Sequence, residues 1–138
     1  MGRILGIDYG SARIGLALSD PTHLIASPLE TITFSSEKDL IAQLREKIDA
    51  QEVEEVVVGM PFRMKGGDSR QTESVRKFVT ALKKAGISAK EEDERLSSVS
   101  AKRALIEQEL KMEKDKGLVD QTAAAIMLQQ YLDKKRSG

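Results

Sequence analysis

The sequence predicts an α/β fold in which helices flank one mixed five-stranded sheet, an antiparallel β-β-β unit followed by β-α units. The first 33 residues hold three extended segments separated by turn residues, which is typical of an antiparallel meander. From residue 36 onward, helical apolar spacing alternates with short strands, which is typical of parallel β-α units. A length of 138 residues suits one such sheet, so we expect residues 1–138 to form a single domain.

The antiparallel unit begins with an apolar strand over residues 3–8, and Gly10 lies in the turn that follows. Residues 14–18 are expected to form the second strand and to pair back on the first. A third extended segment covers residues 24–33 and contains Pro28. Because proline cannot donate a hydrogen bond to a sheet ladder, we expect this segment to be an edge strand or a bent strand.

The first helix is expected to follow Ser36 and Glu37. Its apolar residues lie on one face, namely Leu40, Ile41, Leu44 and Ile48. A valine run over residues 56–58 ends at Gly59 and is typical of a strand that is buried on both faces. Residues 60–67 are rich in turn-forming residues and are expected to form a loop.

The next helix is expected to be capped by Asp68 or Ser69 and to end at Gly86. One face of it is apolar, with Val75, Phe78, Val79 and Leu82. Residues 87–93 are expected to form the last strand. Right-handed crossovers would place the two later strands on the far side of the first strand.

Two further helices are expected at the C-terminal end. The first is capped by Ser97 or Ser98, and a charged loop over residues 111–117 follows it. The last helix starts near Asp120, and the basic residues 134–136 at its C-terminal end interact favourably with the helix dipole. Its apolar face contains Ala124, Met127, Leu128, Tyr131 and Leu132.

The composition excludes several kinds of chemistry. The chain has no cysteine and one histidine, His23, so disulfides, thiolate metal sites and a catalytic pair of histidines are excluded. No apolar stretch approaches the ~20 residues that span a bilayer. Gly6, Asp8 and Gly10 interrupt the N-terminal segment too early for a secretory signal. We therefore expect a cytoplasmic protein without a membrane segment.

The formal net charge is zero, so a nucleic-acid surface would have to come from the distribution of charge. Basic residues concentrate between residues 61 and 84, namely Arg63, Lys65, Arg70, Arg76, Lys77, Lys83 and Lys84. Arg63 and Lys65 lie in the expected loop and are candidates for contacts with phosphate groups. The lysines of the following helix are equally consistent with an ordinary solvated face.

Asp8 is the first candidate for catalysis, because it ends a hydrophobic strand and precedes a glycine turn. Side-chain alternation places it on one sheet face with Ile4 and Gly6. A carboxylate at the end of a central strand is costly to desolvate unless a positive charge meets it. The alternative is a turn aspartate that binds its own backbone.

Asp120 is the second candidate, since it shares the inward stripe of the last helix with Ala124 and Leu128. An N-cap aspartate is the ordinary alternative. The small residues 123–125 would let this helix approach the sheet closely, which would bring Asp120 within reach of Asp8.

A third carboxylate is expected from Asp93 or Glu94, at the end of the last strand, whereas Glu91 and Glu92 are expected to be solvated. Three carboxylates at neighbouring strand and helix ends repel one another, and divalent cations relieve this repulsion. An all-oxygen site without histidine or cysteine suits Mg²⁺ or Mn²⁺.

Four ordered motifs resemble the bacterial pre-16S rRNA nuclease family, whose members are also described as Holliday junction resolvase-like proteins. The motifs are Gly6-Ile7-Asp8-Tyr9-Gly10-Ser11-Ala12-Arg13-Ile14-Gly15, Val58-Gly59-Met60-Pro61 with Met64 and Gly66, Asp93-Glu94-Arg95-Leu96-Ser97, and Asp120-Gln121-Thr122-Ala123-Ala124. The similarity runs from about residue 3 to residue 132. Ala12 departs from the family, which often has lysine there, and the Ser97-Ser98 pair replaces a more usual hydroxyl pair with threonine.

The resemblance implies a ribonuclease H-like fold and a metal-dependent nuclease that matures the 5′ end of 16S rRNA. It implies Asp8, Glu94 and Asp120 as the metal-binding carboxylates, with Asp93 as the alternative to Glu94. The expected mechanism is two-metal phosphodiester hydrolysis with Mg²⁺ or Mn²⁺.

We expect Arg13, Arg63 and Lys65 to hold the substrate backbone. Arg95 is expected either to contact a phosphate or to pair with the nearby acidic residues. Tyr9 is the only aromatic residue expected near the site, so base-specific reading is expected to be poor. Substrate choice would then come from RNA shape or from a ribosomal particle.

Three alternatives remain open at this point. A Holliday junction resolvase would cut branched DNA and needs two active sites on a dimer, whereas this chain is expected to be a monomer or a weak dimer. A non-catalytic protein would keep the fold and bind nucleic acid or a transcription complex. A sugar-kinase-like ATPase would use residues 8–10 as a phosphate loop, but it needs a second such domain.

Overall fold

The computed structural model describes residues 2–10, 13–60, 70–93 and 116–137. Its elements are β1 (Arg3–Tyr9), β2 (Arg13–Ser19), β3 (Ala26–Thr33), α1 (Glu37–Ala50), β4 (Val53–Met60), α2 (Arg70–Lys84), β5 (Ala89–Asp93) and α4 (Lys116–Ser137). The strands form one sheet in the order β3-β2-β1-β4-β5. The first three pair antiparallel, and β4 and β5 run parallel to β1, so the predicted mixed five-stranded sheet is confirmed.

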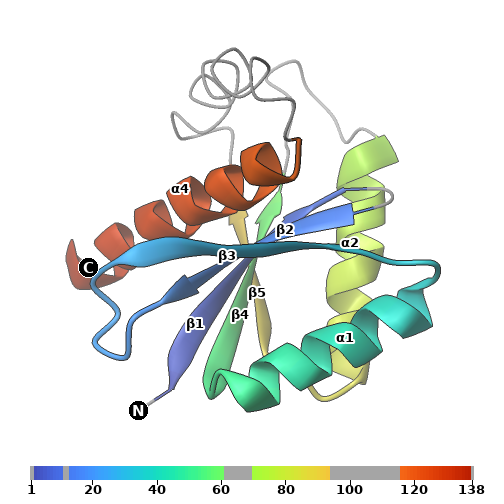
Figure 1. Cartoon of the computed structure of the whole chain (residues 1–138), viewed down its shortest axis with the longest axis horizontal. Helices are drawn as coiled ribbons and strands as arrows, with labels where there is room; N and C mark the ends of the chain where they lie inside the picture. The colour runs from blue at the N-terminus through green and yellow to red at the C-terminus, as the bar shows by residue number, and fades with distance from the viewer. Residues whose placement is uncertain (1, 11–12, 61–69, 94–115, 138) are drawn as a thin grey trace.

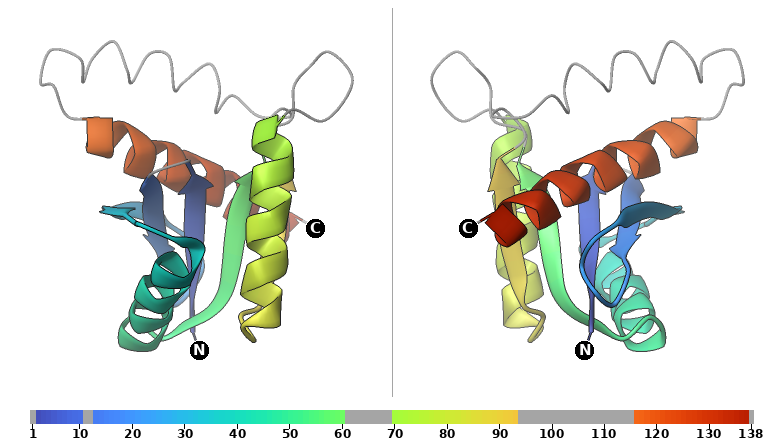
Figure 2. Two further views of the ribbon diagram at one scale, coloured as in Figure 1. Left: turned by 90° about the vertical axis from the view of Figure 1, so that its right-hand side faces the viewer. Right: turned by 90° about the vertical axis from the view of Figure 1, so that its left-hand side faces the viewer.

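Helices cover the sheet on both faces (Figure 1). Helices α1 and α2 pack on one face, where Leu44 and Phe78 join Ile7 and Val58 in the larger hydrophobic cluster. Helix α4 crosses the opposite face obliquely (Figure 2), where Leu128 joins a smaller cluster with Ile4 and Val57. Strand β1 lies at the centre of the sheet, so its alternate side chains supply both clusters.

The predicted elements of the described regions are found, with some shifted boundaries. Ser36 caps α1, and its hydroxyl accepts a hydrogen bond from the Asp39 amide at 3.1 Å. The valines of residues 56–58 are buried on both faces, as predicted for a parallel strand. Strand β4 begins earlier than the valine run, at Val53. Glu54 and Glu55 interrupt the apolar pattern, so the sequence does not reveal this first part of the strand.

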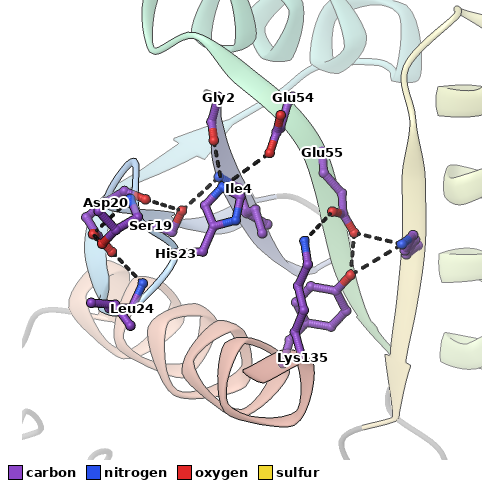
Figure 3. Close-up of polar contacts among 12 residues, drawn as sticks. Gly2, Ile4, Ser19, Asp20, His23, Leu24, Glu54, Glu55 and Lys135 are labelled. Atoms are coloured by element: carbon purple, nitrogen blue, oxygen red, sulfur yellow. Dashed lines mark hydrogen bonds and ion pairs between the residues drawn. The ribbon is translucent and has the colours of Figure 1, made fainter. Parts of the chain in front are cut away.

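Strand β3 is an edge strand, as Pro28 predicted, but it starts two residues later than the sequence suggests. The amides of Leu24 and Ile25 both donate to Asp20 Oδ1 at 2.8 Å and therefore do not join the ladder (Figure 3). The amide of Ile25, followed by the hydroxyl of Thr22, lowers the pKa of Asp20 well below its usual range. The carboxylate of Asp20 thus organises this turn.

The start of α4 corrects the sequence prediction. The helix begins at Lys116, so Asp120 lies inside it and is not an N-cap. The sequence places residues 111–117 in a charged loop that contains a glycine, whereas the structure already includes Lys116 and Gly117 in the helix. The expected caps at Asp68 or Ser69, and the helix after Ser97 or Ser98, lie outside the described residues.

Candidate active site

Asp8 lies near the end of the central strand β1 and is only 7% exposed. Its side chain faces α4, since Ile4 and Gly6 of the same strand also pack against that helix, as the alternation predicts. The next residue, Tyr9, points to the other face and stacks on Phe78 with 4.7 Å between ring centroids. Burial, and then the charge of Glu37, raise the pKa of the Tyr9 hydroxyl. The Tyr9 ring thus packs against the core on the far side of the sheet from Asp8.

Asp120 is 8% exposed and lies on the buried side of α4, together with Ala124 and Leu128. The backbone of the helix touches β2 at this point. A Cβ atom built on Gly15 would lie 2.2 Å from both the carbonyl carbon and the carbonyl oxygen of Asp120. Only glycine allows this approach, because the opposing atoms are main-chain atoms that cannot rotate away.

Gly15 also connects Asp120 to Asp8. In the antiparallel β1–β2 pair, Asp8 lies directly opposite Gly15. Residues opposite one another in such a pair have Cα atoms about 4.5–5.5 Å apart and present their side chains on the same face. The Asp120 backbone and Asp8 therefore both lie next to Gly15, whose missing side chain leaves space between β2 and α4.

Arg13 completes this group of charges. It begins β2 and, by alternation, lies on the α4 face with Gly15. Its Nε donates to Asp120 Oδ2 in an ion pair, with the Arg13 side chain 42% exposed and that of Asp120 12% exposed. The sequence suggested Arg13 as a phosphate contact and did not reveal this partner.

The far half of α4 is fixed to the sheet by a second polar cluster, centred on Glu55 of β4 (Figure 3). The Tyr131 hydroxyl donates to Glu55 Oε1, and the ammonium groups of Lys90 and Lys135 lie 3.3 and 3.6 Å from its carboxylate oxygens. Burial alone would raise the pKa of Glu55, but the hydrogen bonds from Tyr131 and Lys90 and the lysine charges outweigh it and lower that pKa. These contacts attach the C-terminal half of α4, the helix that carries Asp120, to strand β4.

Glu92 corrects the expectation of a solvated acidic stretch. Glu91 is exposed, but Glu92 is only 7% exposed and lies opposite Gly59 in the β4–β5 pair. Lys134 of α4 pairs with Glu92 Oε1 at 3.3 Å. Alternation along β5 turns this residue toward α4, and the basic C-terminal turn of the helix compensates its charge.

The remaining predicted site residues, and the single histidine, lie elsewhere or outside the described residues. Glu94, Arg63, Lys65 and Arg95 lie outside the described residues. Asp93 is the last residue of β5. His23 binds the Gly2 carbonyl at 2.6 Å and Glu54 at 3.2 Å, at the opposite end of β1 from Asp8 (Figure 3).

The arrangement suits a hard cation. Asp8 and Asp120 are both buried, and their carboxylate oxygens are the ligands that Mg²⁺ and Mn²⁺ prefer. The ion pair with the Arg13 guanidinium shows that a positive group can bind at Asp120. Within the described ranges no three acidic, histidine or cysteine side chains gather around one point. The role of Asp8 and Asp120 as metal ligands therefore stays a prediction, as does the third ligand.

The sequence analysis did not predict the close approach of α4 to Gly15, although the sequence contains a signal for it. A glycine inside an otherwise apolar strand often marks a place where another backbone approaches closely. Applied to residues 13–19, this principle points to a close contact at Gly15, directly across from Asp8.

The mixed sheet and its helices define the class of the protein, which is ribonuclease H-like. *Thermus thermophilus* RuvC, solved in complex with a Holliday junction substrate, aligns with a TM-score of 0.58 over 99% of this chain and 96% of RuvC, at 18% identity. The fowlpox virus resolvase, solved with Holliday junction DNA, aligns with a TM-score of 0.57 over 96% of this chain and 98% of the resolvase, at 11% identity. At these identities the likeness shows the fold.

The chain belongs to the RuvX family, described as Holliday junction resolvase, whose family model matches residues 2–134. Relatives from *Koribacter versatilis* and *Halothermothrix orenii* have names that give pre-16S rRNA nuclease as an inferred activity. The first is 40% identical over 97% of this chain and 88% of the relative, and the second 42% identical over 95% and 94%. The resemblance found in the four motifs is thus confirmed. Across the described ranges, no helix has the length and apolar character that crossing a membrane requires.

Proposed function

We propose that this chain is a divalent-metal-dependent nuclease that processes the 5′ end of pre-16S rRNA in the cytoplasm, with residues 1–138 acting as one nuclease domain. The observation that carries the proposal is the contact of the Asp120 backbone with Gly15, directly opposite Asp8. This contact would let the buried carboxylates of Asp8 and Asp120 share one end of the central strand, where a metal-dependent hydrolase needs them. The names of the full-length relatives support the choice of RNA as substrate.

Asp8 and Asp120 would hold Mg²⁺ or Mn²⁺ together with Glu94. Glu94 is the third ligand that the family resemblance implies, and Asp93 is the alternative to it. The bound ions would supply an activated water and stabilise the departing 3′ oxygen.

The chain's own residues position the substrate. Asp8 lies on the central strand and Asp120 on a helix fixed at both halves, so neither carboxylate depends on a loop for its placement. Arg13, Arg63, Lys65 and Arg95 would contact phosphate groups of the RNA.

Cleavage of branched DNA is the second candidate, because the family description names Holliday junction resolvase. Symmetric cleavage of a junction needs two active sites related by a two-fold axis. Among the described residues, Leu24 and Ile25 are the large apolar side chains that are exposed, which is a small surface for a stable dimer. This favours a monomer or weak dimer and RNA as the substrate.

One assay separates the candidates. Purified protein with Mn²⁺ is incubated with an RNA that spans the 5′ boundary of 16S rRNA and, in parallel, with a four-way DNA junction. The proposal predicts cleavage of the RNA and its loss in Asp8→Asn. Symmetric cleavage of the junction with intact RNA would establish the resolvase instead, and binding of RNA without cleavage would establish a non-catalytic protein.

A further inference from the structure

The ion pair between Arg13 and Asp120 joins two residues with different expected tasks, one a phosphate contact and the other a metal ligand. Arg13 precedes Gly15 by two residues on β2, about 7 Å along the strand, and shares its face. Arg13 therefore lies close to Gly15, the residue that is next to both Asp8 and the Asp120 backbone.

The two side chains differ in their access to water. The Arg13 side chain is 42% exposed, whereas that of Asp120 is 12% exposed. A carboxylate at this depth is costly without a positive partner, and the guanidinium supplies one. The Arg13 side chain is thus the more solvent-exposed partner of the pair.

We propose that Arg13 is a positioning residue with two alternative partners. It holds Asp120 while no divalent cation is bound, and it turns to a phosphate of the nucleic acid once a cation takes Asp120. This inference rests on the proposed function, because it assumes that Asp120 is a metal ligand.

The exchange follows from the chemistry of the groups. A divalent cation carries twice the charge of the guanidinium and prefers carboxylate oxygen. A guanidinium binds phosphate through two parallel hydrogen bonds, so the released Arg13 finds a strong partner when substrate is present. Its backbone stays fixed in β2, so only the side chain has to move.

Two consequences distinguish this role from that of a structural ion pair. Arg13 competes with the cation for Asp120, so removing the guanidinium strengthens metal binding in the absence of nucleic acid. If Arg13 only oriented Asp120, its removal would weaken metal binding. Because coupling between two ligands is reciprocal, Arg13 also contributes more to RNA binding when metal is present than when it is absent.

The first experiment measures Mn²⁺ affinity by calorimetry without nucleic acid, in the wild type and in Arg13→Ala and Arg13→Gln. Arg136→Ala is the matched control, because Arg136 also pairs with an aspartate of α4, Asp133, and its side chain is 47% exposed. We expect Mn²⁺ to bind roughly twofold to fivefold more tightly to both Arg13 variants, the range expected for a half-exposed pair. The control should match the wild type. Unchanged or weaker Mn²⁺ binding in the Arg13 variants would overturn the inference.

The second experiment compares RNA binding in EDTA with the KM for RNA cleavage in Mn²⁺. Arg13→Ala should raise KM by a larger factor than it raises the Kd in EDTA, and equal factors would contradict the exchange of partners. If the wild type binds Mn²⁺ but cleaves no RNA, the proposed function fails, and the calorimetry alone still decides for or against competition at Asp120.

Discussion

Gly15→Ala tests whether the close approach of α4 to β2 sets the geometry of the site. The new Cβ would lie 2.2 Å from the Asp120 carbonyl carbon and oxygen and 2.6 Å from the Gln121 nitrogen, whereas ordinary contact begins at 3.4 Å. All of these are backbone atoms, so the helix must move away from the strand by roughly 1 Å. This movement separates Asp120 from Asp8.

The expected effect has two parts. Overpacking of this kind costs about 1–3 kcal/mol, which corresponds to a fall in Tm of roughly 3–12 °C for a chain of this size. A displacement of about 1 Å in a catalytic group lowers the cleavage rate by roughly a hundredfold. The rise in Tm that Mn²⁺ produces in the wild type should shrink as well, because the displaced carboxylate holds the ion less well.

Gly86→Ala is the matched control. Gly86 has a φ of +83°, and nothing lies within 4 Å of its added Cβ. Alanine there costs on the order of 1 kcal/mol through backbone strain alone and leaves α4 in place. Both variants are assayed well below their Tm with Mn²⁺ and RNA. A wild-type rate and a wild-type Mn²⁺ shift in Gly15→Ala would refute the reasoning, as would an equal loss of rate in Gly86→Ala.

Three further predictions concern stability. Leu128→Ala removes a fully buried side chain between α4 and Gly6 and should lower the free energy of unfolding by about 2–5 kcal/mol, measured by urea denaturation. Ser36→Ala removes the hydroxyl that accepts from the Asp39 amide and should cost about 1 kcal/mol, seen as a lower urea midpoint with an unchanged slope. The pKa of Glu55 is lowered from its ordinary value of 4.5, so its contribution to stability is present above pH 4.5 and lost as the pH falls through the lower pKa of the folded state. Glu55→Gln should therefore be less stable at pH 7 and decline less steeply on acidification, and parallel profiles for the two proteins would contradict this.

The sheet was predictable from the sequence because its burial pattern is regular. Strand β1 lies at the centre, so its apolar run, the valines of β4 and the turn at Gly10 together indicate the order of pairing. Pro28 indicated that β3 is an edge strand, because proline has no amide hydrogen to donate to a neighbouring strand.

Features that depend on polar partners were not predictable in this way. No local pattern in the sequence marks Glu55 or Glu92, yet their side chains are only 11% and 9% exposed and pair with lysines near the end of α4, some 40 to 80 positions away along the chain. The start of α4 was missed because Gly117 and the charged residues before it are typical of a loop, although the helix already begins at Lys116. Long-range ion pairs leave no local pattern, and only the fold brings their partners together.

The site was predictable in part. The inward stripe of Asp120, Ala124 and Leu128 indicated that Asp120 faces the sheet, and the structure places it next to the strand partner of Asp8. The pairing of Arg13 with Asp120 joins positions 107 residues apart, and no spacing rule connects them. The roles of Glu94, Arg63, Lys65 and Arg95 stay predictions.

The most direct test of the central claim, that Asp8 and Asp120 form one metal-dependent site, is a comparison of RNA cleavage rates in Mn²⁺ for Asp8→Asn, Asp120→Asn and the double variant. Asp133→Asn is the control, as an exposed aspartate of α4 that also pairs with an arginine. Residues that act as a unit have strongly non-additive effects. We predict that each single variant loses at least about a hundredfold in rate and that the double variant loses little more. Wild-type rates in either single variant, or losses that multiply in the double variant, would contradict the account.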